Sequence, residues 1–247
     1  MSRQSIGFTQ RIQLEWLEWT AQMALADFSE DEIYAELQNR LRPIVSVGGH
    51  DNRSNRGKVV GILLKIWVKT ADELRPFRDE GLEFLAQSSP SNHLPLHWGM
   101  SMATYPFFGT VVNAVGRLIH LQNSVTLAQV SRRVQEKYGQ RESIHRATQR
   151  VFYCLHDWGV LAKTDERMVY TGVKLIAISS HRLSSWLIEA GMIAANAQST
   201  PLDSALQMPV LFPFSLTTPR VTQNQRLELF RQGLDNDFIL RTEAPVG

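Results

Sequence analysis

The sequence predicts a mainly α-helical protein in three parts: an N-terminal helical bundle at 1–92, a helix–turn–helix with a small β-hairpin at 93–172, and a C-terminal helical extension at 173–247. Three observations predict this fold class. Hydrophobic residues make up 43% of the 247 positions, which supports a sizeable core. Most of them recur every three or four positions, as on the buried face of a helix. After Gly159 the spacing changes to two, which indicates strands.

The N-terminal part contains the first predicted helices. An apolar stripe at 8–26 indicates one long helix. Ser29 and Glu32 form an S-x-x-E capping box, in which each side chain bonds the other residue's backbone N–H, and this motif opens a second helix. A third helix follows, and Thr70 with Glu73 repeats the capping motif before a fourth.

Later elements are separated by turn-forming residues. The stretch SSPSNH at 88–93 is a linker candidate and sets the first boundary. A long helix is predicted at 105–122 and another at 181–195. A last short helix is predicted at 225–232, closed by Gly233.

Composition and charge limit the classes of function. The one cysteine, Cys154, excludes an intrachain disulfide framework or a thiolate metal cluster, so we expect a cytoplasmic protein. A formal net charge of +2 is too small for the whole chain to act as a nucleic-acid binder, so any basic surface must be local. The sequence opens without an apolar signal region and contains no run typical of a membrane span, so no membrane partner is expected.

The strongest pattern lies at 124–171. Thr126 and Gln129 form a capping box in front of one helix, and a second helix follows a short connection. Residues 160–164 and 167–171 alternate as two strands of a hairpin. The second helix carries apolar residues at the spacing that buries one face: Ile144, Ala147, Val151 and Leu155.

This order of elements resembles the winged-helix superfamily over about Tyr105 to Thr171, and the phrase LHDWGVL resembles the end of its recognition helix entering the first wing strand. The resemblance implies a winged helix whose second helix enters the major groove of double-stranded DNA. Arginine can pair with guanine, glutamine can pair with adenine, and cations on neighbouring elements can hold phosphates. The DNA-binding residues predicted on this basis are Arg132, Arg133, Lys137, Arg141, His145, Arg146, Gln149, Arg150, Lys163 and Arg167.

Local charge favours this hypothesis. Between Ser124 and Arg167, eight positive and five negative side chains give +3, which exceeds the +2 of the whole chain. Two alternatives stay open. The unit could bind protein as a structural adaptor, because winged helices also serve as assembly modules. Less favoured is an enzyme, such as a nuclease with an unfamiliar acidic site. Separately, Asp235 and Asp237 could suggest a metal-dependent carboxylate pair, but GLDNDF is more typical of a turn.

A second resemblance concerns the helical arm before this unit. The phrase LHWGMSMATYPFF, followed by a winged helix, is similar to the small helical BrxA proteins of BREX phage-defence systems. This resemblance implies an accessory subunit of a DNA-associated defence complex, with other protein subunits as partners. A regulator of transcription is the other form of DNA binding that we consider.

Several chemical motifs are rejected, so no catalytic residue, cofactor or metal is predicted. GGHDNRSNRGKV lacks the spacing and the Ser or Thr of a phosphate-binding loop, although Arg53, Arg56 and Lys58 could touch a nucleic-acid backbone. His93 and His97 are four residues apart, but Pro95 lies between them and no third ligand is evident, so a structural role is favoured. Cys154 is interpreted as a small buried residue rather than a nucleophile.

Overall fold

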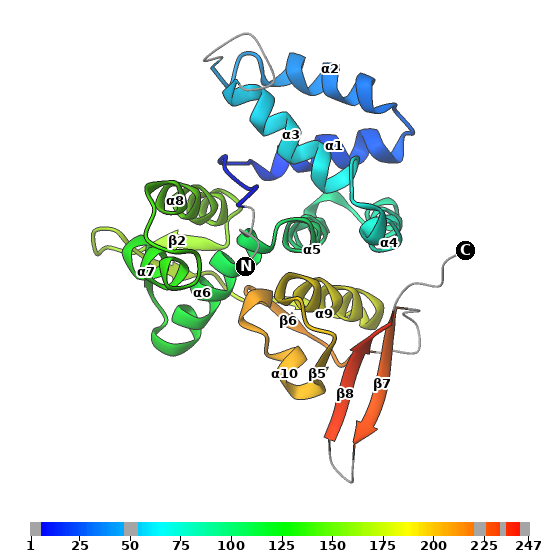
Figure 1. Ribbon diagram of the computed structural model, residues 1–247, viewed down its shortest axis with the longest axis vertical. Helices are drawn as coiled ribbons and strands as arrows, with labels where there is room; N and C mark the ends of the chain where they lie inside the picture. The colour runs from blue at the N-terminus through cyan, green and yellow to red at the C-terminus, as the bar shows by residue number, and fades with distance from the viewer. Residues whose placement is uncertain (1–5, 47–53, 220–225, 233–235, 243–247) are drawn as a thin grey trace.

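The computed structural model describes residues 6–46, 54–219, 226–232 and 236–242. The fold is mainly helical, as the sequence predicts. Of its N-terminal helices, the first three lie at the top of the view in Figure 1 and the fourth lies below them. They are α1 (Leu14–Leu25), α2 (Glu30–Leu41), α3 (Asn55–Trp67) and α4 (Arg75–Gln87), with short 3-10 helices η1 (Asp72–Leu74) and η2 (Pro90–Asn92).

The starts of these helices test the capping predictions. The Ser29–Glu32 box is confirmed, because both of its side chain–backbone bonds form. The prediction of a Thr70–Glu73 box is wrong, because the Thr70 hydroxyl donates instead to the carbonyl of Ile66 in the preceding helix. The Thr70 side chain therefore closes α3 rather than opening the next turn.

The first helix begins six residues later than the sequence predicts. Residues 8–13 are not helical, although Phe8 and Ile12 are fully buried. The Ile12 N–H donates to Cys154 Sγ over 3.1 Å, and its carbonyl accepts from Trp158 Nε1 over 2.9 Å. Because these partners satisfy its backbone, the segment can run without helical hydrogen bonds.

Helix α5 (Leu94–Thr104) lies at the centre of the molecule, between the N-terminal helices and α9 (His181–Ala195) (Figure 1). Every residue from Pro95 to Ala103 is buried. Such a helix is a core element, because it has no solvated face. One cluster of buried side chains includes residues of all three predicted parts. The division of the chain into these three domains stays a prediction.

A compact unit follows α5. In chain order it contains α6 (Pro106–Gln122), β1 (Val125–Thr126), α7 (Leu127–Tyr138), α8 (Glu142–Asp157), β2 (Leu161–Lys163) and β3 (Val169–Gly172). The strands form one antiparallel sheet in the order β1-β3-β2, with Val125 opposite Tyr170 and Leu161 opposite Gly172. The Thr126–Gln129 capping box is formed at the start of α7, as predicted.

The C-terminal part mixes helices and strands. Its further elements are β4 (Ile176–Ile178), β5 (Ser199–Pro201), α10 (Leu202–Leu206), η3 (Pro209–Leu211), β6 (Phe214–Leu216), β7 (Leu227–Gln232) and β8 (Asn236–Arg241). Strands β4 and β6 pair in parallel, and β5, β8 and β7 form a second sheet in that order.

The prediction of a short helix at 225–232 is therefore wrong. Residues 227–232 form β7, which pairs in register with β8 from Leu227–Arg241 to Gln232–Asn236. The six residues LELFRQ fit the spacing of a helix as well as that of a strand. Pairing with β8, a later segment, therefore decides that they form a strand. Gly233, predicted to close that helix, lies outside the described residues. In the described part of the chain, no helix has the length and apolar character needed to span a membrane.

Candidate nucleic-acid interface

Helix α8 has one buried face and one outer face. Ile144, Ala147, Val151 and Leu155 are all buried, which confirms the inner face that the sequence predicts. Of the predicted DNA-binding residues in its first half, Arg146 is exposed, and His145 and Gln149 are partly exposed. Gln149 lies four positions after His145 and three after Arg146, so the three side chains share one side of the helix.

Helix α7 packs against α8 and presents cations on its outer side. Val130 and Val134 are buried, whereas Arg132, Arg133 and Lys137 are exposed. The Arg133 guanidinium lies 3.7 Å from Glu136 in a solvated pair. Lys137 Nζ donates to the hydroxyl of Thr110 over 3.4 Å. Arg132 makes no ion pair with any described residue.

The connection between α7 and α8 is also basic. Arg141 is exposed, and its guanidinium donates to the Tyr138 carbonyl over 3.1 Å. The Arg146 guanidinium pairs with Glu142 over 2.8 Å, with about two thirds of each side chain exposed. That pair lowers the pKa of Glu142 through the hydrogen bond from Arg146. A surface pair of this kind contributes little to stability, so Arg146 can exchange it for another anion.

The N-terminal segment covers the second half of α8. The guanidinium of Arg150 donates to the Thr9 carbonyl, and Arg11 forms a bidentate pair with Asp157 and lies over the Tyr153 ring. Arg150 therefore contacts the N-terminal segment, and its side chain is partly exposed, as are those of His145 and Gln149. The sequence gives no local signal of this contact, because the partners are 141 to 146 residues apart.

The hairpin of β2 and β3 carries the last two predicted residues. Lys163 and Arg167 are exposed and make no ion pair within the described ranges. The Thr164 hydroxyl donates to the Val169 carbonyl over 3.1 Å and accepts from the Glu166 N–H over 3.2 Å, which fixes the turn. Asp165 and Glu166 are exposed at the same tip, so the turn offers both signs of charge.

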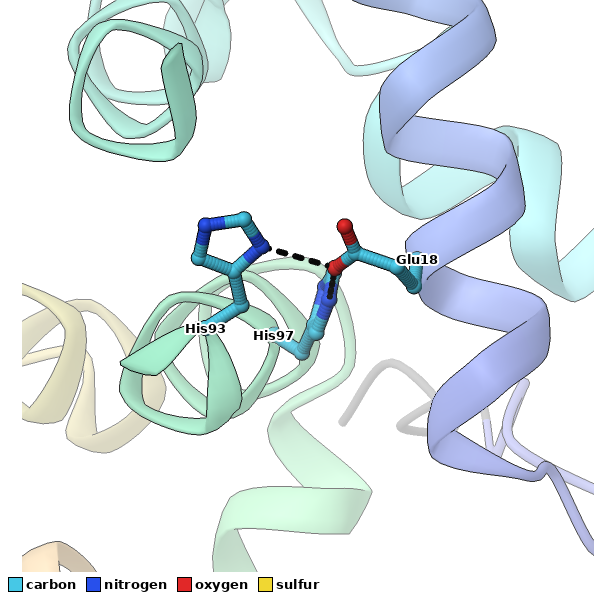
Figure 2. A group of neighbouring side chains, drawn as sticks. All are labelled: Glu18, His93 and His97. Atoms are coloured by element: carbon cyan, nitrogen blue, oxygen red, sulfur yellow. Dashed lines mark hydrogen bonds and ion pairs between the residues drawn. The ribbon is translucent and has the colours of Figure 1, made fainter. Parts of the chain in front are cut away.

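A second group of polar side chains is buried between α1 and α5. Figure 2 shows Glu18 reaching from α1 toward His93 and His97 at the start of α5. One carboxylate oxygen of Glu18 lies 2.9 Å from His93 Nδ1 and 2.9 Å from His97 Nε2. Pro95 occupies the first turn of α5, where proline is tolerated, so the two histidines can share a helical face after all. Glu18 is the third polar partner that the sequence could not reveal, because it lies 75 residues before His93.

Glu18, His93 and His97 are close enough together to hold one ion, but the hydrogen bonds of His97 do not fit a metal ligand. A histidine that binds metal through one nitrogen carries its proton on the other, which it donates to an acceptor. Here the indole N–H of Trp67 donates to His97 Nδ1 over 3.2 Å, so Nδ1 carries a lone pair and Nε2 carries the proton. That proton is directed at Glu18. The arrangement supports the structural role that the sequence favours for the two histidines.

Protonation follows from the same contacts. Burial lowers the pKa of His97, which keeps that ring neutral. Both nitrogens of His93 face acceptors, the Glu18 carboxylate and the Ser88 carbonyl. Burial opposes ionisation of Glu18, but hydrogen bonds from His97, His93 and Gln22 outweigh it and lower the pKa of Glu18 to about 2.

Glu18→Gln should destabilise the protein at neutral pH by about 1–3 kcal/mol, because it replaces the charged acceptor of two buried N–H groups with a neutral amide. The pKa of Glu18 is below its ordinary value of 4.5, so the carboxylate stabilises the fold fully above that value. The difference between parent and variant should therefore narrow as the pH falls from 4.5 toward 2. Urea unfolding across this range measures it, with Glu15→Gln, exposed on the same helix, as the control. A difference independent of pH would contradict the assigned contacts.

The single cysteine does not add a reactive group. Cys154 is fully buried in α8, and burial raises the pKa of its thiol to about 12. A thiol with that pKa is not ionised at neutral pH, so it does not act as a nucleophile or a metal ligand. The sequence interpretation of Cys154 as a small core residue is confirmed.

The remaining candidates are placed only in part. Lys58 is exposed in α3, and Arg56 donates to the Gln38 side chain over 2.6 Å, while Arg53 lies outside the described residues. The Asp237 carboxylate pairs with Arg231 over 2.8 Å, and Asp235 is outside the described ranges. The carboxylate pair considered for a metal ion therefore has one member, Asp237, paired with a neighbouring cation.

Comparisons with protein-family models, with curated proteins and with solved structures find no match to this chain. The candidate interface on α7, α8 and the β2–β3 hairpin is therefore argued from its geometry and charge alone.

Proposed function

We propose that residues 106–172 form a winged helix and that the protein binds double-stranded DNA with α8 as the recognition helix. The observation that carries this proposal is the order helix, short strand, two helices and hairpin, with the short strand pairing to β3 in the sheet β1-β3-β2. In winged helices that order presents the second helix of the pair to the major groove and the hairpin to the backbone.

The free cations support contact with phosphate. Arg132, Lys163 and Arg167 are exposed and make no ion pair with the residues that the structure describes. Lys137 and Arg141 are also exposed and bond only to neutral oxygens among the same residues. Such side chains exchange water and counterions for phosphate oxygens, which is the main source of affinity for DNA.

The first half of α8 is the part that we assign to the groove. His145, Arg146 and Gln149 offer donors on its outer side. Arg150, in the following turn, donates to the Thr9 carbonyl of the N-terminal segment, so the part of α8 that we assign to base contacts is about two turns long. Recognition helices use their N-terminal residues for base contacts, so the covering N-terminal segment leaves the relevant end open. We assign base readout to Arg146 and Gln149.

The accessory role in a phage-defence complex is part of the same proposal. Its support is the phrase LHWGMSMATYPFF, which forms α5 and the first turn of α6. Nearly all of these side chains are buried, so the phrase describes a packing arrangement rather than a contact surface. The phrase therefore identifies no surface for partner subunits.

The adaptor alternative is favoured by one observation, the exposed Asp165 and Glu166 at the tip of the hairpin. Two carboxylates at that position repel phosphate. If the unit binds protein instead of DNA, removing cations from α7 and α8 will leave DNA affinity unchanged.

The double substitution Arg132→Ala and Arg146→Ala should weaken binding to a random duplex at least tenfold, or about 1.4 kcal/mol. Both side chains are exposed, so the fold should be retained. The matched control is Arg40→Ala with Arg75→Ala, which removes two exposed, ion-paired arginines from α2 and α4. Fluorescence anisotropy at low salt measures both. Equal affinities of the two double variants would overturn the proposed interface.

A further inference from the structure

Strand β7 forms an open edge of the C-terminal sheet. The sheet order β5-β8-β7 pairs β7 on one side only within the described residues. Figure 1 shows the β7–β8 hairpin projecting from the body of the molecule, with β7 outermost. An edge of this kind presents unpaired N–H and C=O groups that can bind another strand.

The hydrogen-bond phase of the hairpin identifies which backbone groups are free. The Thr242 N–H donates to the Arg226 carbonyl over 3.0 Å, which makes these two residues a hydrogen-bonded pair. Such pairs alternate along an antiparallel ladder. The N–H and C=O groups of Leu227, Leu229 and Arg231 therefore point away from β8.

The middle of this edge is apolar. Leu229 and Phe230 are each 52% exposed, on opposite faces of the sheet. Leu229 stands opposite Ile239 of β8, which is fully buried. Proteins protect long edges with proline, bulges or charges. LELFRQ contains no proline, and its two charged residues, Glu228 and Arg231, lie on either side of its apolar centre.

We propose that β7 pairs antiparallel with β7 of a second copy of this chain, with Leu229 on the twofold axis. A twofold axis between two equivalent antiparallel strands is perpendicular to the sheet and passes through a residue that faces its own copy. The free backbone groups allow Leu227, Leu229 or Arg231 at that point as a hydrogen-bonded pair, and Glu228 or Phe230 as a non-hydrogen-bonded pair. Glu228 would oppose its own charge, and a register centred on Phe230 leaves the free groups of Leu227 without a partner in β7, whereas the register centred on Leu229 uses the free groups of all three outward residues. Arg231 would oppose its own charge, and Leu227 is buried and would leave half of the strand unpaired.

The register centred on Leu229 is self-complementary. It places Leu227 opposite Arg231 of the second copy and Glu228 opposite Phe230 of the second copy, so like charges do not meet. It also joins Ile239 and Leu229 to the same two residues of the second copy in one apolar row across four strands. The inference is independent of the proposed DNA-binding function.

Cysteine crosslinking tests the register. Facing residues of a hydrogen-bonded antiparallel pair have Cα atoms about 5.5 Å apart, which suits a disulfide. Leu229→Cys should therefore give a covalent dimer rapidly on mild oxidation. Arg231→Cys is the matched control, because its own copy would lie four residues along the strand, roughly 13 Å away. The parent should not crosslink, since Cys154 is buried.

Sedimentation measures the association itself. The parent should have twice the 28.1 kDa chain mass at micromolar concentration. Leu229→Arg should weaken dimerisation at least tenfold while the monomer stays folded, whereas Leu175→Arg, at a similarly exposed leucine elsewhere, should leave dimerisation unchanged. A monomeric parent would mean that another part of the chain or another protein covers β7. That result, or equal crosslinking of Leu229→Cys and Arg231→Cys, would overturn the proposal.

Discussion

Arg226→Met should lower the free energy of unfolding by about 3–5 kcal/mol, because it leaves two buried carboxylates without their shared cation. The Arg226 guanidinium lies 2.5 Å from Glu80 of α4 and 2.8 Å from Glu189 of α9. The side chains of Glu80 and Glu189 are 8% and 3% exposed, so water cannot replace the lost partner. Arg182 also bonds Glu80, over 2.7 Å, but reaches it from a more exposed position.

Urea unfolding of the parent and variant measures this loss. Arg231→Met is the matched control, because Arg231 follows on the same hairpin and pairs with Asp237 in solvent. Its cost should stay below about 1 kcal/mol. Combining Arg226→Met with Glu80→Gln and Glu189→Gln should recover part of the stability, since no buried charge is then left unpaired. A loss below 1 kcal/mol for Arg226→Met alone would show that the cluster is solvated.

Gly116→Ala should destabilise the protein by about 3 kcal/mol, at the upper end of the usual cost of overpacking. Gly116 lies where α6 packs against η3. A Cβ at this position would approach the Pro209 carbonyl oxygen to 2.0 Å and its carbon to 2.8 Å. Both atoms belong to the backbone, so the two elements must separate to admit a methyl group.

Gly61→Ala in α3 is the control for this substitution. A Cβ there meets nothing within 4 Å, and alanine is favoured over glycine inside a helix by about 0.5–1 kcal/mol. The control should therefore be neutral or stabilising in thermal melting. If both variants melt like the parent, the contact between α6 and η3 does not exist as described.

The sequence predicts best where local chemistry is decisive. The Thr126–Gln129 box and the face containing Ile144 and Leu155 are confirmed, because capping and helical periodicity depend on residues a few positions apart. The mainly helical class follows from many such signals. The wrong prediction at 225–232 arose where six residues fit either period, and pairing with β8 decided between them.

The candidate site could be predicted only in outline. Spacing placed Arg146, Gln149 and Arg150 on one side of α8, but it gave no sign that Arg150 donates to the carbonyl of Thr9 in the N-terminal segment. Glu18 was missed for the same reason, since its partners His93 and His97 come from another helix. Contacts between distant segments have no signature in a single sequence, because packing rather than local propensity creates them.

The affinity of the parent protein for a random DNA duplex across a salt series tests the proposed function most directly. The exposed cations on α7, α8 and the hairpin should release counterions when they meet phosphates. If about four of them do so, the logarithm of the association constant should fall with the logarithm of salt concentration at a slope of about −3 to −4. An absence of binding at low salt, or an affinity that does not change between about 50 and 200 mM salt, would contradict DNA binding by this surface.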